Sequence, residues 1–292
     1  MRATAYAKLT LTLEVLGRRD DGFHDLDAFA VSVADPHDVV EVEAVPHPGG
    51  ITLELAGETD DVPATPRNLA VRAGESLMLR AGRSGHGVRM TLRKKIPAGA
   101  GLGGGSADAA AAIRAIQKLL DIEVDDAGLM EVGASVGSDV PFCLTGGAAR
   151  MLGRGEILEP VDLPVGLSLL VAIPPYRLST PQVYAAWDEL GGPQATRFIE
   201  PPPELAGIVG ELANDLEPAA EAVEPGLAEF RVALEEVAGA PAILAGSGSA
   251  YAVLLGGEAD RASSLARKVR RALKVPIAAS RTVSRGVRLG TR

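Results

Sequence analysis

Cysteine is nearly absent from this chain, because Cys143 is the only one among 292 residues. One cysteine cannot close a disulfide within the chain, so we expect a protein of the reducing cytoplasm. Cys143 lies in the stretch VPFCLTGG, where no partner for a nucleophilic thiol is evident. We therefore expect a small buried residue at this position rather than a nucleophile.

Membrane segments and an excess of basic charge are also lacking. The longest apolar stretch, VGLSLLVAIPP, is too short to cross a bilayer. The amino-terminal segment alternates and contains Glu14, unlike the apolar core of a secretory signal. The formal net charge of −9 argues against a nucleic-acid-binding protein, which needs a basic face. An anionic small molecule stays possible, because a local pocket can be positive in an acidic protein.

The remaining composition, 47% hydrophobic and 23% charged, is typical of a soluble globular protein. In the first half, alternating residues predict strands and helical spacing predicts helices. The expected strands are 5–16, 39–45, 50–57 and 87–97, and the expected helices are 67–82, 126–137 and one from about residue 106. We expect the first strand to be covered on one face only, and the last to hold its Arg and Lys in water.

The second half has a different order of elements. We expect a strand over 166–175, a helix over 179–190, a proline-rich connection over 197–204 and two further helical stretches. The predicted strands 241–246 and 249–257, helix 259–273 and strand 276–284 complete it. Without the extra helices the order is β-α-β-β-α-β, a ferredoxin-like pattern. The chain is therefore predicted to be an α+β protein of two domains, 1–160 and 161–292.

The stretch KKIPAGAGLGGGSADAA contains five glycines among residues 99–105. Gly99, Gly101 and Gly104 fit the dinucleotide pattern G-x-G-x-x-G, but the preceding strand is amphipathic and charged, unlike the buried strand of a Rossmann unit. No GK[ST] follows, which excludes a Walker loop. Glycines that lead directly into a helix can still hold an anion, because the helix begins with unpaired N–H groups and the positive end of its dipole.

Two polar residues follow the glycines. Ser106 is expected either to cap the helix or to offer its hydroxyl group to a phosphate or metal, and Asp108 suits the helix dipole. A flexible glycine loop without a ligand is the alternative, which the immediate start of a helix disfavours.

The segment PAGAGLGGGSADAA resembles the ATP loop of the GHMP kinase superfamily, which includes galactokinase, homoserine kinase and mevalonate kinase. Other segments resemble those superfamily members that phosphorylate a methylerythritol carrying a cytidine diphosphate. They run in order from residue 7 to residue 253: AKLTLTLEVLGRRDDGFHDL, NLAVRA, GSDVPFCLTGGAARMLGRGE, STPQVY, NDLEP and LAGSGSAYAV. DGFH and GSDVPF separate these members from their relatives better than the glycine run does.

The resemblance implies a fold, an activity and two ligands. The fold would have an N-terminal mixed α/β nucleotide-binding domain and a C-terminal ferredoxin-like domain. The activity would be ATP-dependent phosphorylation of the 2-hydroxyl group of that methylerythritol, in the non-mevalonate route to isoprenoids. Mg²⁺ is expected to arrive with ATP, because no His, Cys or carboxylate cluster has metal-ligand spacing. The protein is expected to be a monomer or a weak homodimer.

Phosphoryl transfer to an alcohol needs positioned charges and a group that receives the hydroxyl proton. Asp139, between Gly137 and Pro141, is predicted to lie on a sharp helix-to-strand turn and to act as this base; an Asx turn is the structural alternative. Lys8 is expected to pair with Asp139 and offset the phosphoryl charge, although a strand lysine is usually only solvated. The family resemblance favours the catalytic interpretation of both residues.

The remaining site residues are implied by the resemblance. ATP is expected on the loop and residues flanking it: Asn68, Lys94, Lys95, Pro97, Ala98, Gly99, Ala100, Gly101, Leu102, Gly103, Gly104, Gly105 and Ser106. Phe23 and His24 would hold the cytosine, with Tyr184 stacked on its other side, although core packing of Tyr184 and Trp187 is an open alternative. Gly246, Ser247 and Gly248 would lie near the substrate phosphates, but a tight hairpin also explains them.

One residue departs from the family pattern. Thr10 stands where the family usually has Asn, which keeps a hydroxyl group but loses the paired donor and acceptor of an amide. Two other functions stay open: a related kinase with a homoserine-like or mevalonate-like acceptor, and a nucleotide sensor without activity. The DGFH segment disfavours the first, since such acceptors carry no base, and the presence of both Lys8 and Asp139 disfavours the second.

Overall fold

The computed structural model describes residues 1–46, 49–163, 165–192, 212–256 and 259–290. The predicted proline-rich connection over 197–204 lies outside these residues. Within them, no helix is both long and apolar enough to span a membrane.

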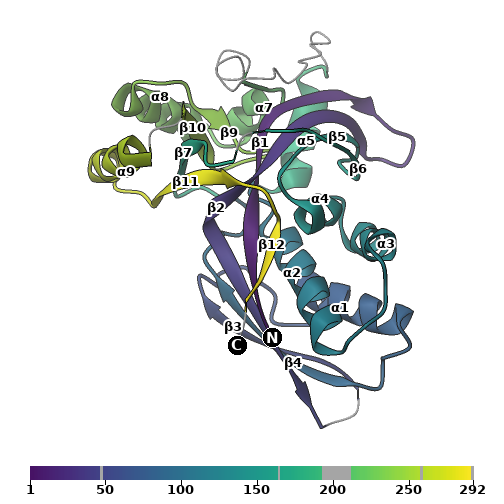
Figure 1. Ribbon diagram of the computed structural model, residues 1–292. Helices are drawn as coiled ribbons and strands as arrows, with labels where there is room; N and C mark the ends of the chain where they lie inside the picture. The colour runs from purple at the N-terminus through teal and green to yellow at the C-terminus, as the bar shows by residue number, and fades with distance from the viewer. Residues whose placement is uncertain (47–48, 164, 193–211, 257–258, 291–292) are drawn as a thin grey trace.

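The first half of the chain is a sheet with helices packed against one side (Figure 1). Its strands are β1 (Arg2–Arg18), β2 (His24–Val45), β3 (Gly50–Gly57), β4 (Gly87–Lys94), β5 (Ala148–Gly153) and β6 (Ile157–Pro160). Its helices are α1 (Leu69–Arg80), α2 (Gly104–Leu119), α3 (Asp126–Val136) and α4 (Val140–Thr145). The alanine-rich stretch Ala109–Ala112 of α2 is completely buried, which lets the helix lie close to its neighbours.

The strand β1 is buried on both faces, so the prediction that only one face is covered was wrong. The apolar side chains of Ala7, Leu9 and Leu11 are buried in the core. The alternate positions Lys8 and Thr10 are also buried, at 9% and 2% exposure. These polar side chains face the glycine run and Gly246, because alternate residues of a strand point to opposite sides. One face of β1 therefore packs in the hydrophobic core, and the other faces the glycine run instead of water.

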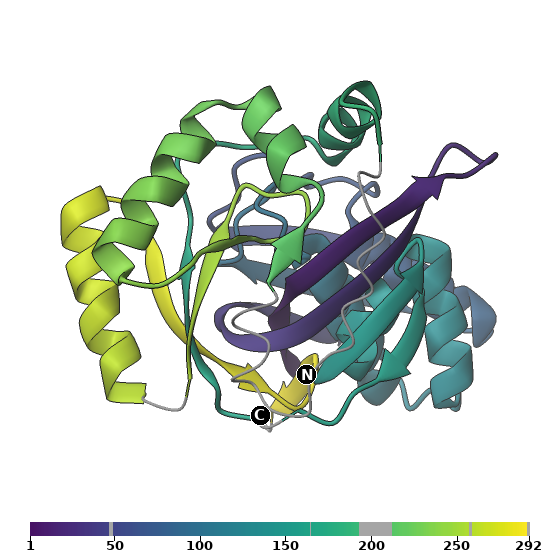
Figure 2. The ribbon, with the colours of Figure 1, turned by 90° about the horizontal axis from the view of Figure 1, so that it is seen from above.

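The second half of the chain builds a four-stranded antiparallel layer. Strands β7 (Ser168–Ala172), β9 (Ile243–Leu244), β10 (Tyr251–Gly256) and β11 (Ile277–Val283) lie in the order β11-β7-β10-β9. Helix α5 (Thr180–Glu189) follows β7, α7 (Glu217–Val223) and α8 (Gly226–Ala238) precede β9, and α9 (Ala259–Leu273) connects β10 to β11. This order confirms the predicted ferredoxin-like pattern. Helices α8 and α9 lie side by side on one face of the layer (Figure 2).

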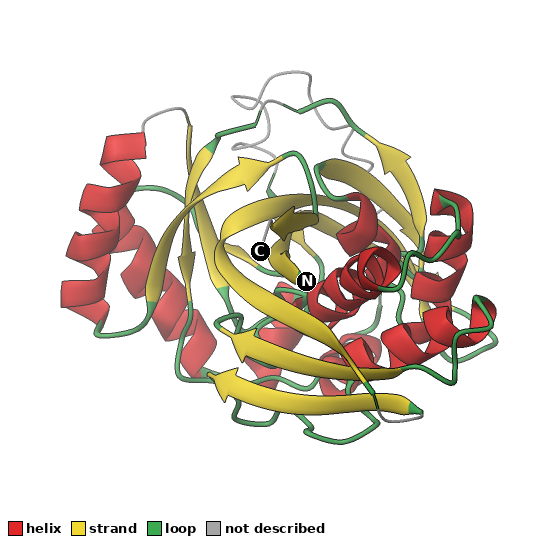
Figure 3. Ribbon diagram, turned by 60° about the horizontal axis from the view of Figure 1, so that its bottom comes forward, coloured by secondary structure: helices red, strands yellow, loops and turns green. Residues whose placement is uncertain are grey.

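Strands also connect the two halves. Strand β11 pairs with β7 in the second half and with β2 in the first, where Thr282 lies opposite Val33. The short β8 (Ala213–Asn214) and the last strand β12 (Val287–Gly290) both pair with β1. The described strands form one continuous hydrogen-bonded sheet that branches at β1 and β2. Helices lie at both ends of this sheet (Figure 3). The α+β class is confirmed, while the division at residue 160 stays a prediction.

Candidate active site

The glycine run forms a loop between β4 and α2 that is held by backbone contacts on two sides. On one side, the Lys8 amide of β1 donates to the Leu102 carbonyl at 3.0 Å. On the other, the amide of Ala250 donates to the carbonyl of Ala100 at 3.1 Å. A Cβ added at Gly101, which has φ of +73°, would lie 1.8 Å from the carbonyl oxygen of Ala245. Only glycine therefore fits between these segments.

Helix α2 starts at Gly104, two residues before the predicted start at about residue 106. Its N-cap is Gly103 in the left-handed conformation, and no side chain caps the helix. The interpretation of Ser106 as an N-cap was therefore wrong, and this residue lies in the first turn instead. Since no side chain occupies the capping position, the first N–H groups of α2 are suited to an anion.

The amine of Lys8 and the carboxylate of Asp139 form an ion pair beside this loop. The Lys8 Nζ to Asp139 Oδ1 distance is 2.9 Å, and the two side chains are 11% and 32% exposed. Asp139 is the N-cap of α4, so it lies between two helices and not at the predicted helix-to-strand turn. Its side chain makes no cap hydrogen bond, which leaves the carboxylate directed to Lys8. A Cβ on Gly103 would lie 3.2 Å from Lys8 Cβ and 4.0 Å from Asp139 Oδ2.

Two cavities meet at the glycine loop. The larger, of about 690 Å³, contains the Lys8–Asp139 pair and reaches the loop that carries Phe23. The smaller, of about 230 Å³, lies between the glycine loop and the segment before α1. Gly99, Gly101, Gly103, Gly104 and Gly105 line both cavities. The loop is thus accessible from two separate spaces.

The predicted ATP residues divide between these cavities. Asn68, Lys94 and the loop from Pro97 to Gly105 line the smaller one, and Ser106 lines the larger one. Lys95 is exposed and lines neither of them. Asn68 is the N-cap of α1, where its Oδ1 accepts the amide of Ala70 at 2.9 Å.

Lys94 is buried in a group of three charges under the loop. Its Nζ contacts Asp38 of β2 and lies 2.7 Å from Asp108 Oδ2 of α2. It was expected in water with the basic residues of β4, and Asp108 was expected at the helix dipole; both expectations were wrong. Burial opposes the charge on Lys94, but Asp108 and Asp38 outweigh it and hold its pKa above the usual value. Burial, and then Asp38, raise the pKa of Asp108 well above the usual value against the opposing effect of Lys94.

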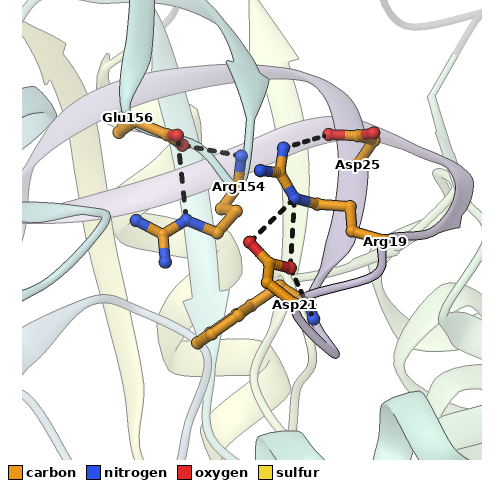
Figure 4. A network of polar contacts seen from close by, with 6 residues as sticks. Arg19, Asp21, Asp25, Arg154 and Glu156 are labelled. Atoms are coloured by element: carbon orange, nitrogen blue, oxygen red, sulfur yellow. Dashed lines mark hydrogen bonds and ion pairs between the residues drawn. The ribbon is translucent and has the colours of Figure 1, made fainter.

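The loop between β1 and β2 lines the larger cavity with Gly22 and Phe23. Figure 4 shows the polar contacts of this loop. The Arg19 guanidinium contacts Asp21 at 3.2 Å and Asp25 at 2.8 Å, and Asp21 accepts the amide of Phe23 at 3.1 Å. The hydrogen bonds from Arg19 and Phe23 hold the pKa of Asp21 below its usual value. Phe23 is 52% exposed, and the guanidinium carbon of Arg154 lies 4.8 Å from its ring centre. This exposed ring leaves apolar surface on the cavity wall.

His24 is held by three side chains of α5. Its ring stacks on Tyr184 with centres 4.8 Å apart and meets the edge of Trp187 at 5.5 Å. Its Nε2 lies 2.8 Å from Asp188 Oδ1. Tyr184 lines the cavity, whereas Trp187 is 6% exposed and belongs to the core, as one of the two interpretations proposed. Tyr184 is thus stacked on His24, which is itself a predicted substrate-binding residue. Burial, and then the charge of Asp139, raise the pKa of Tyr184.

The turn before β10 completes the site. Gly246 and Ser247 line the larger cavity, and Gly248 lies behind them, its amide donating to Ala245 at 2.8 Å. The Asn214 amide holds the turn through its Nδ2, which donates to the carbonyls of Leu244 and Gly246 at 2.9 and 2.7 Å. Thr10 lies beneath, and its buried Oγ1 has no hydrogen-bond partner in the described part of the chain.

Comparisons with known proteins show which family this chain resembles. The model of the GHMP kinases N terminal domain matches residues 68–147, which include α1, the glycine loop and Asp139. A 4-diphosphocytidyl-2-C-methyl-D-erythritol kinase of Pelotomaculum thermopropionicum is 41% identical over 84% of this chain and 86% of its own length. One from Moorella thermoacetica is 38% identical over 88% of this chain and 91% of its own length.

The chain belongs to the 4-diphosphocytidyl-2-C-methyl-D-erythritol kinase family.

Solved structures show the same relationship. The crystal structure of a 4-(cytidine 5'-diphospho)-2C-methyl-D-erythritol kinase covers 97% of this chain and 100% of its own, with a TM-score of 0.77 and 33% identity. A homoserine kinase from Cytophaga hutchinsonii has a TM-score of 0.71 at 19% identity over 99% of this chain and 96% of its own, and therefore shares the fold. The fold predicted from the glycine run and its flanking segments is confirmed by these matches.

Four residues at the larger cavity were not among the predicted site residues. Arg18, Arg154 and Asp188 line the larger cavity, and Asn214 holds its turn. Asn214 and Arg154 occur in segments that carry the family resemblance, NDLEP and AARMLGRGE, so those motifs contained the signal. Arg18 also lies in such a segment, AKLTLTLEVLGRRDDGFHDL, whereas Asp188 is an ordinary charged residue near a predicted helix end and lies in none of them. Cys143 is buried as predicted, and burial raises the pKa of its thiol.

Proposed function

We propose that this chain transfers the γ-phosphoryl group of ATP to the 2-hydroxyl group of 4-diphosphocytidyl-2-C-methyl-D-erythritol, a step of the non-mevalonate route to isoprenoids. Its family membership supports the reaction type and the two substrates. The observation that carries the proposal is the Lys8–Asp139 pair, 2.9 Å apart, at the loop where two cavities meet. ATP would occupy the smaller cavity and the loop, and the alcohol would occupy the larger one.

Asp139 would receive the proton of the acceptor hydroxyl group. The hydroxyl oxygen attacks the γ-phosphorus, the bond from that phosphorus to the ADP oxygen breaks, and the hydroxyl proton passes to the Asp139 carboxylate. Lys8 holds that carboxylate in position and provides positive charge next to the transferred group. The position of the carboxylate beside the hydroxyl group makes it the proton acceptor of this step.

The loop and the arginines would hold the two phosphate chains. The N–H groups at the start of α2 are directed at a space that no capping side chain fills, and this arrangement fits the phosphates of ATP. Arg18 and Arg154 both line the larger cavity, where a guanidinium group can bind a diphosphate. They extend the positive charge of Lys8 along the length of that cavity.

Mg²⁺ would be bound mainly by the ATP phosphates. Among the described residues, no group of three or more His, Cys, Asp or Glu side chains could hold a metal ion. Ser106 and Asp139 line the same cavity beside the loop, and their oxygen atoms would be available to an ion arriving with ATP. When bound, the ion would neutralise charge on the phosphates.

The residues Phe23 and His24 on the cavity wall support a substrate that carries cytidine. A half-exposed aromatic ring and a buried imidazole at one end of the cavity suit a nucleobase, whereas a homoserine-like or mevalonate-like acceptor has no ring to place there. The ion pair of Lys8 with Asp139 favours an enzyme over a sensor, because nucleotide binding alone requires no proton acceptor.

A phosphoryl-transfer assay tests this proposal with ATP, Mg²⁺ and each candidate acceptor. We expect transfer to the cytidyl diphosphate substrate and no comparable transfer to homoserine or mevalonate. Asp139→Asn should lower kcat by about 10²- to 10⁴-fold, the usual contribution of a general base. Asp126→Asn is the matched control, because Asp126 is exposed on α3 and, among the described residues, forms an ion pair with Arg114 alone. Wild-type protein without transfer, or full turnover by Asp139→Asn, would contradict the proposal.

A further inference from the structure

The α5 helix directs a carboxylate at the imidazole of His24. Tyr184, Trp187 and Asp188 occupy one side of α5, at spacings of three and four residues, and all three contact the His24 ring. The stack with Tyr184 and the edge contact with Trp187 fix the plane of the ring. The 2.8 Å contact between Nε2 and Asp188 Oδ1 then fixes the orientation of the ring within that plane. His24 is 8% exposed, so the ring has little space for another orientation.

This contact determines which ring nitrogen carries the proton. An ionised carboxylate can only accept hydrogen bonds, so Nε2 must donate to it. In the neutral imidazole the other nitrogen, Nδ1, then has a lone pair and no hydrogen. Nδ1 has no hydrogen-bond partner among the described residues, and His24 lines the larger cavity. His24, a residue of the cavity wall, therefore keeps one acceptor without a partner among the described residues, and Asp188 sets its state.

The carboxylate itself is held from the other side. Arg18 Nη1 lies 3.7 Å from Asp188 Oδ2, so the two carboxylate oxygens face different partners. Rotation of the carboxylate away from His24 would also move it away from this cation. Both Arg18 and Asp188 line the same cavity as His24. The side chains of Arg18, Asp188 and His24 thus form a chain of polar contacts, and the Nδ1 lone pair of His24 lies at its end.

We propose that Asp188 is a specificity-determining residue that makes the site select cytosine over uracil. It acts through His24, as a positioning residue, by holding the tautomer whose Nδ1 accepts a hydrogen bond. This inference rests on the proposed function, because it assumes that the base of the acceptor substrate lies against His24. The exocyclic amino group of cytosine would donate to Nδ1.

Uracil offers the opposite chemistry at that position. It carries a carbonyl oxygen where cytosine carries the amino group, so two acceptors would face each other and neither would be satisfied. One buried polar group left without its partner typically lowers affinity by about 10- to 100-fold. The other tautomer, with hydrogen on Nδ1, would reverse this preference. Base selectivity is therefore a direct consequence of where Asp188 holds the proton.

The test compares two acceptors, the cytidyl diphosphate substrate and its uridyl analogue, at pH 8. We expect wild-type protein to favour the cytidyl compound by about 100-fold in kcat/KM. Asp188→Asn should reduce this ratio by about 10-fold, because the amide can donate to Nε2 as well as accept from it and no longer fixes one tautomer. The change should come from KM, with kcat for the cytidyl compound within about 3-fold of wild type.

Glu189→Gln is the matched control for the loss of a carboxylate on α5. Glu189 is the next residue of the helix, is exposed and does not line the cavity, so its variant should keep the wild-type ratio. A merely structural role for Asp188 would lower kcat/KM for both acceptors equally. An unchanged ratio in Asp188→Asn would therefore overturn the inference.

A second measurement does not depend on phosphoryl transfer. The ¹⁵N chemical shifts of the His24 ring, assigned by comparison with a His24→Gln variant, should show a protonated Nε2 and an unprotonated Nδ1 at pH 8. The affinities for CMP and UMP should show the same preference for cytosine and the same loss in Asp188→Asn. A protonated Nδ1 would overturn the inference. Absence of transfer with the predicted tautomer and base preference would count against the proposed function alone.

Discussion

Thr10 is a buried polar residue whose hydroxyl oxygen has no partner in the described part of the chain. A buried polar group without a hydrogen bond lowers the stability of a fold, and such groups are therefore uncommon except where a ligand supplies the partner. Thr10 lies two residues from Lys8 on the same side of β1 and lines the same cavity. We infer that the hydroxyl group is kept for the acceptor substrate.

Thr10→Val tests this inference because it replaces the hydroxyl group by a methyl group of similar size. We expect the free energy of unfolding to stay the same or to rise by about 1 kcal/mol, since an unsatisfied group is removed. The KM for the acceptor should rise by about 10-fold, while the KM for ATP should not change. Urea unfolding and steady-state kinetics measure the two effects.

Thr12→Val serves as the control for this substitution. Thr12 lies on the same strand, is only partly buried and does not line the cavity, so its variant should keep both KM values. A Thr10→Val variant with wild-type kinetics and lower stability would show that the hydroxyl group is structural.

At the residue scale, the sequence led to Lys8 and Asp139 but not to their surroundings. The local patterns alone left a solvated lysine and an Asx turn open, and the family resemblance singled out both residues, which the structure places 2.9 Å apart. Asp188 was missed because a single aspartate near a helix end is common, and only the packing of α5 against β2 brings it to His24. Side chains that act through another residue leave no local pattern.

At the scale of elements, the group Lys94, Asp38 and Asp108 connects β4, β2 and α2 under the phosphate loop. Asp38 Oδ1 also accepts the amides of Lys95 and Ile96 at 2.5 and 2.9 Å, which fixes the backbone that enters the loop. With two carboxylates and one amine, the group has an excess of negative charge when all three are ionised. Asp108 Oδ1 has no partner in the described residues, which is consistent with its raised pKa.

This arrangement predicts how stability depends on pH. The pKa of Asp108 is higher in the folded than in the unfolded state. The stability that comes from its protonation in the folded state is therefore fully present below the unfolded pKa of about 3.9 and is lost as pH rises through the folded pKa. Lys94 contributes no slope between pH 5 and 8, because its pKa lies above the usual value. Asp108→Asn removes the titration, so wild-type stability should fall relative to this variant as pH rises from 5 to 8.

Urea unfolding of both proteins across this range measures the difference. Asp121→Asn is the control, because Asp121 is an exposed residue in the turn after α2 and Asn also tolerates its φ of 49°. Its stability relative to wild type should be independent of pH. A relative stability of Asp108→Asn that stays flat or moves in the opposite direction would show that Asp108 is ionised in the folded state.

Sequence patterns gave the elements near this group but not its burial. The alternation of β4 predicted Arg89 and Arg93 in water, which the structure confirms, but the same alternation could not separate Lys94 from Lys95. A charged residue is buried only when partners from other elements compensate it, and those partners are distant in sequence. The 22-residue strand β2 was similarly recognised only in its apolar last third.

At the scale of the whole molecule, the site is assembled from both halves. Lys8, Asp139 and the glycine loop come from the first half, and Tyr184, Asp188 and the turn at Gly246 come from the second. Strands β8, β11 and β12 return from the second half to the first. The order of predicted elements was sufficient for the α+β class and for the ferredoxin-like pattern of the second half. It could not show these returning strands, because short strands of ordinary composition carry no information about their partner.

The return of β12 makes the stability of one half depend on the other. Gly286, just before β12, accepts the amide of Tyr6 at 2.9 Å, and a Cβ added there would lie 1.8 Å from the carbonyl oxygen of Cys143 in α4. Gly286→Ala should therefore lower the free energy of unfolding by about 2–3 kcal/mol, the usual cost of overpacking. Gly85→Ala should have little effect, because nothing lies within 4 Å of its added Cβ.

The two halves should unfold together in this experiment. Trp187, the only tryptophan, reports on the second half by fluorescence, while far-UV circular dichroism reports on the whole chain. The added methyl group of Gly286→Ala would press on α4 of the first half. We nevertheless expect it to lower both urea midpoints equally, because β1 and β2 share hydrogen bonds with β12 and β11. A fluorescence midpoint that stays at the wild-type value while the dichroism midpoint falls would mean that the halves unfold independently. In that case the returning strands would not couple the two walls of the active site.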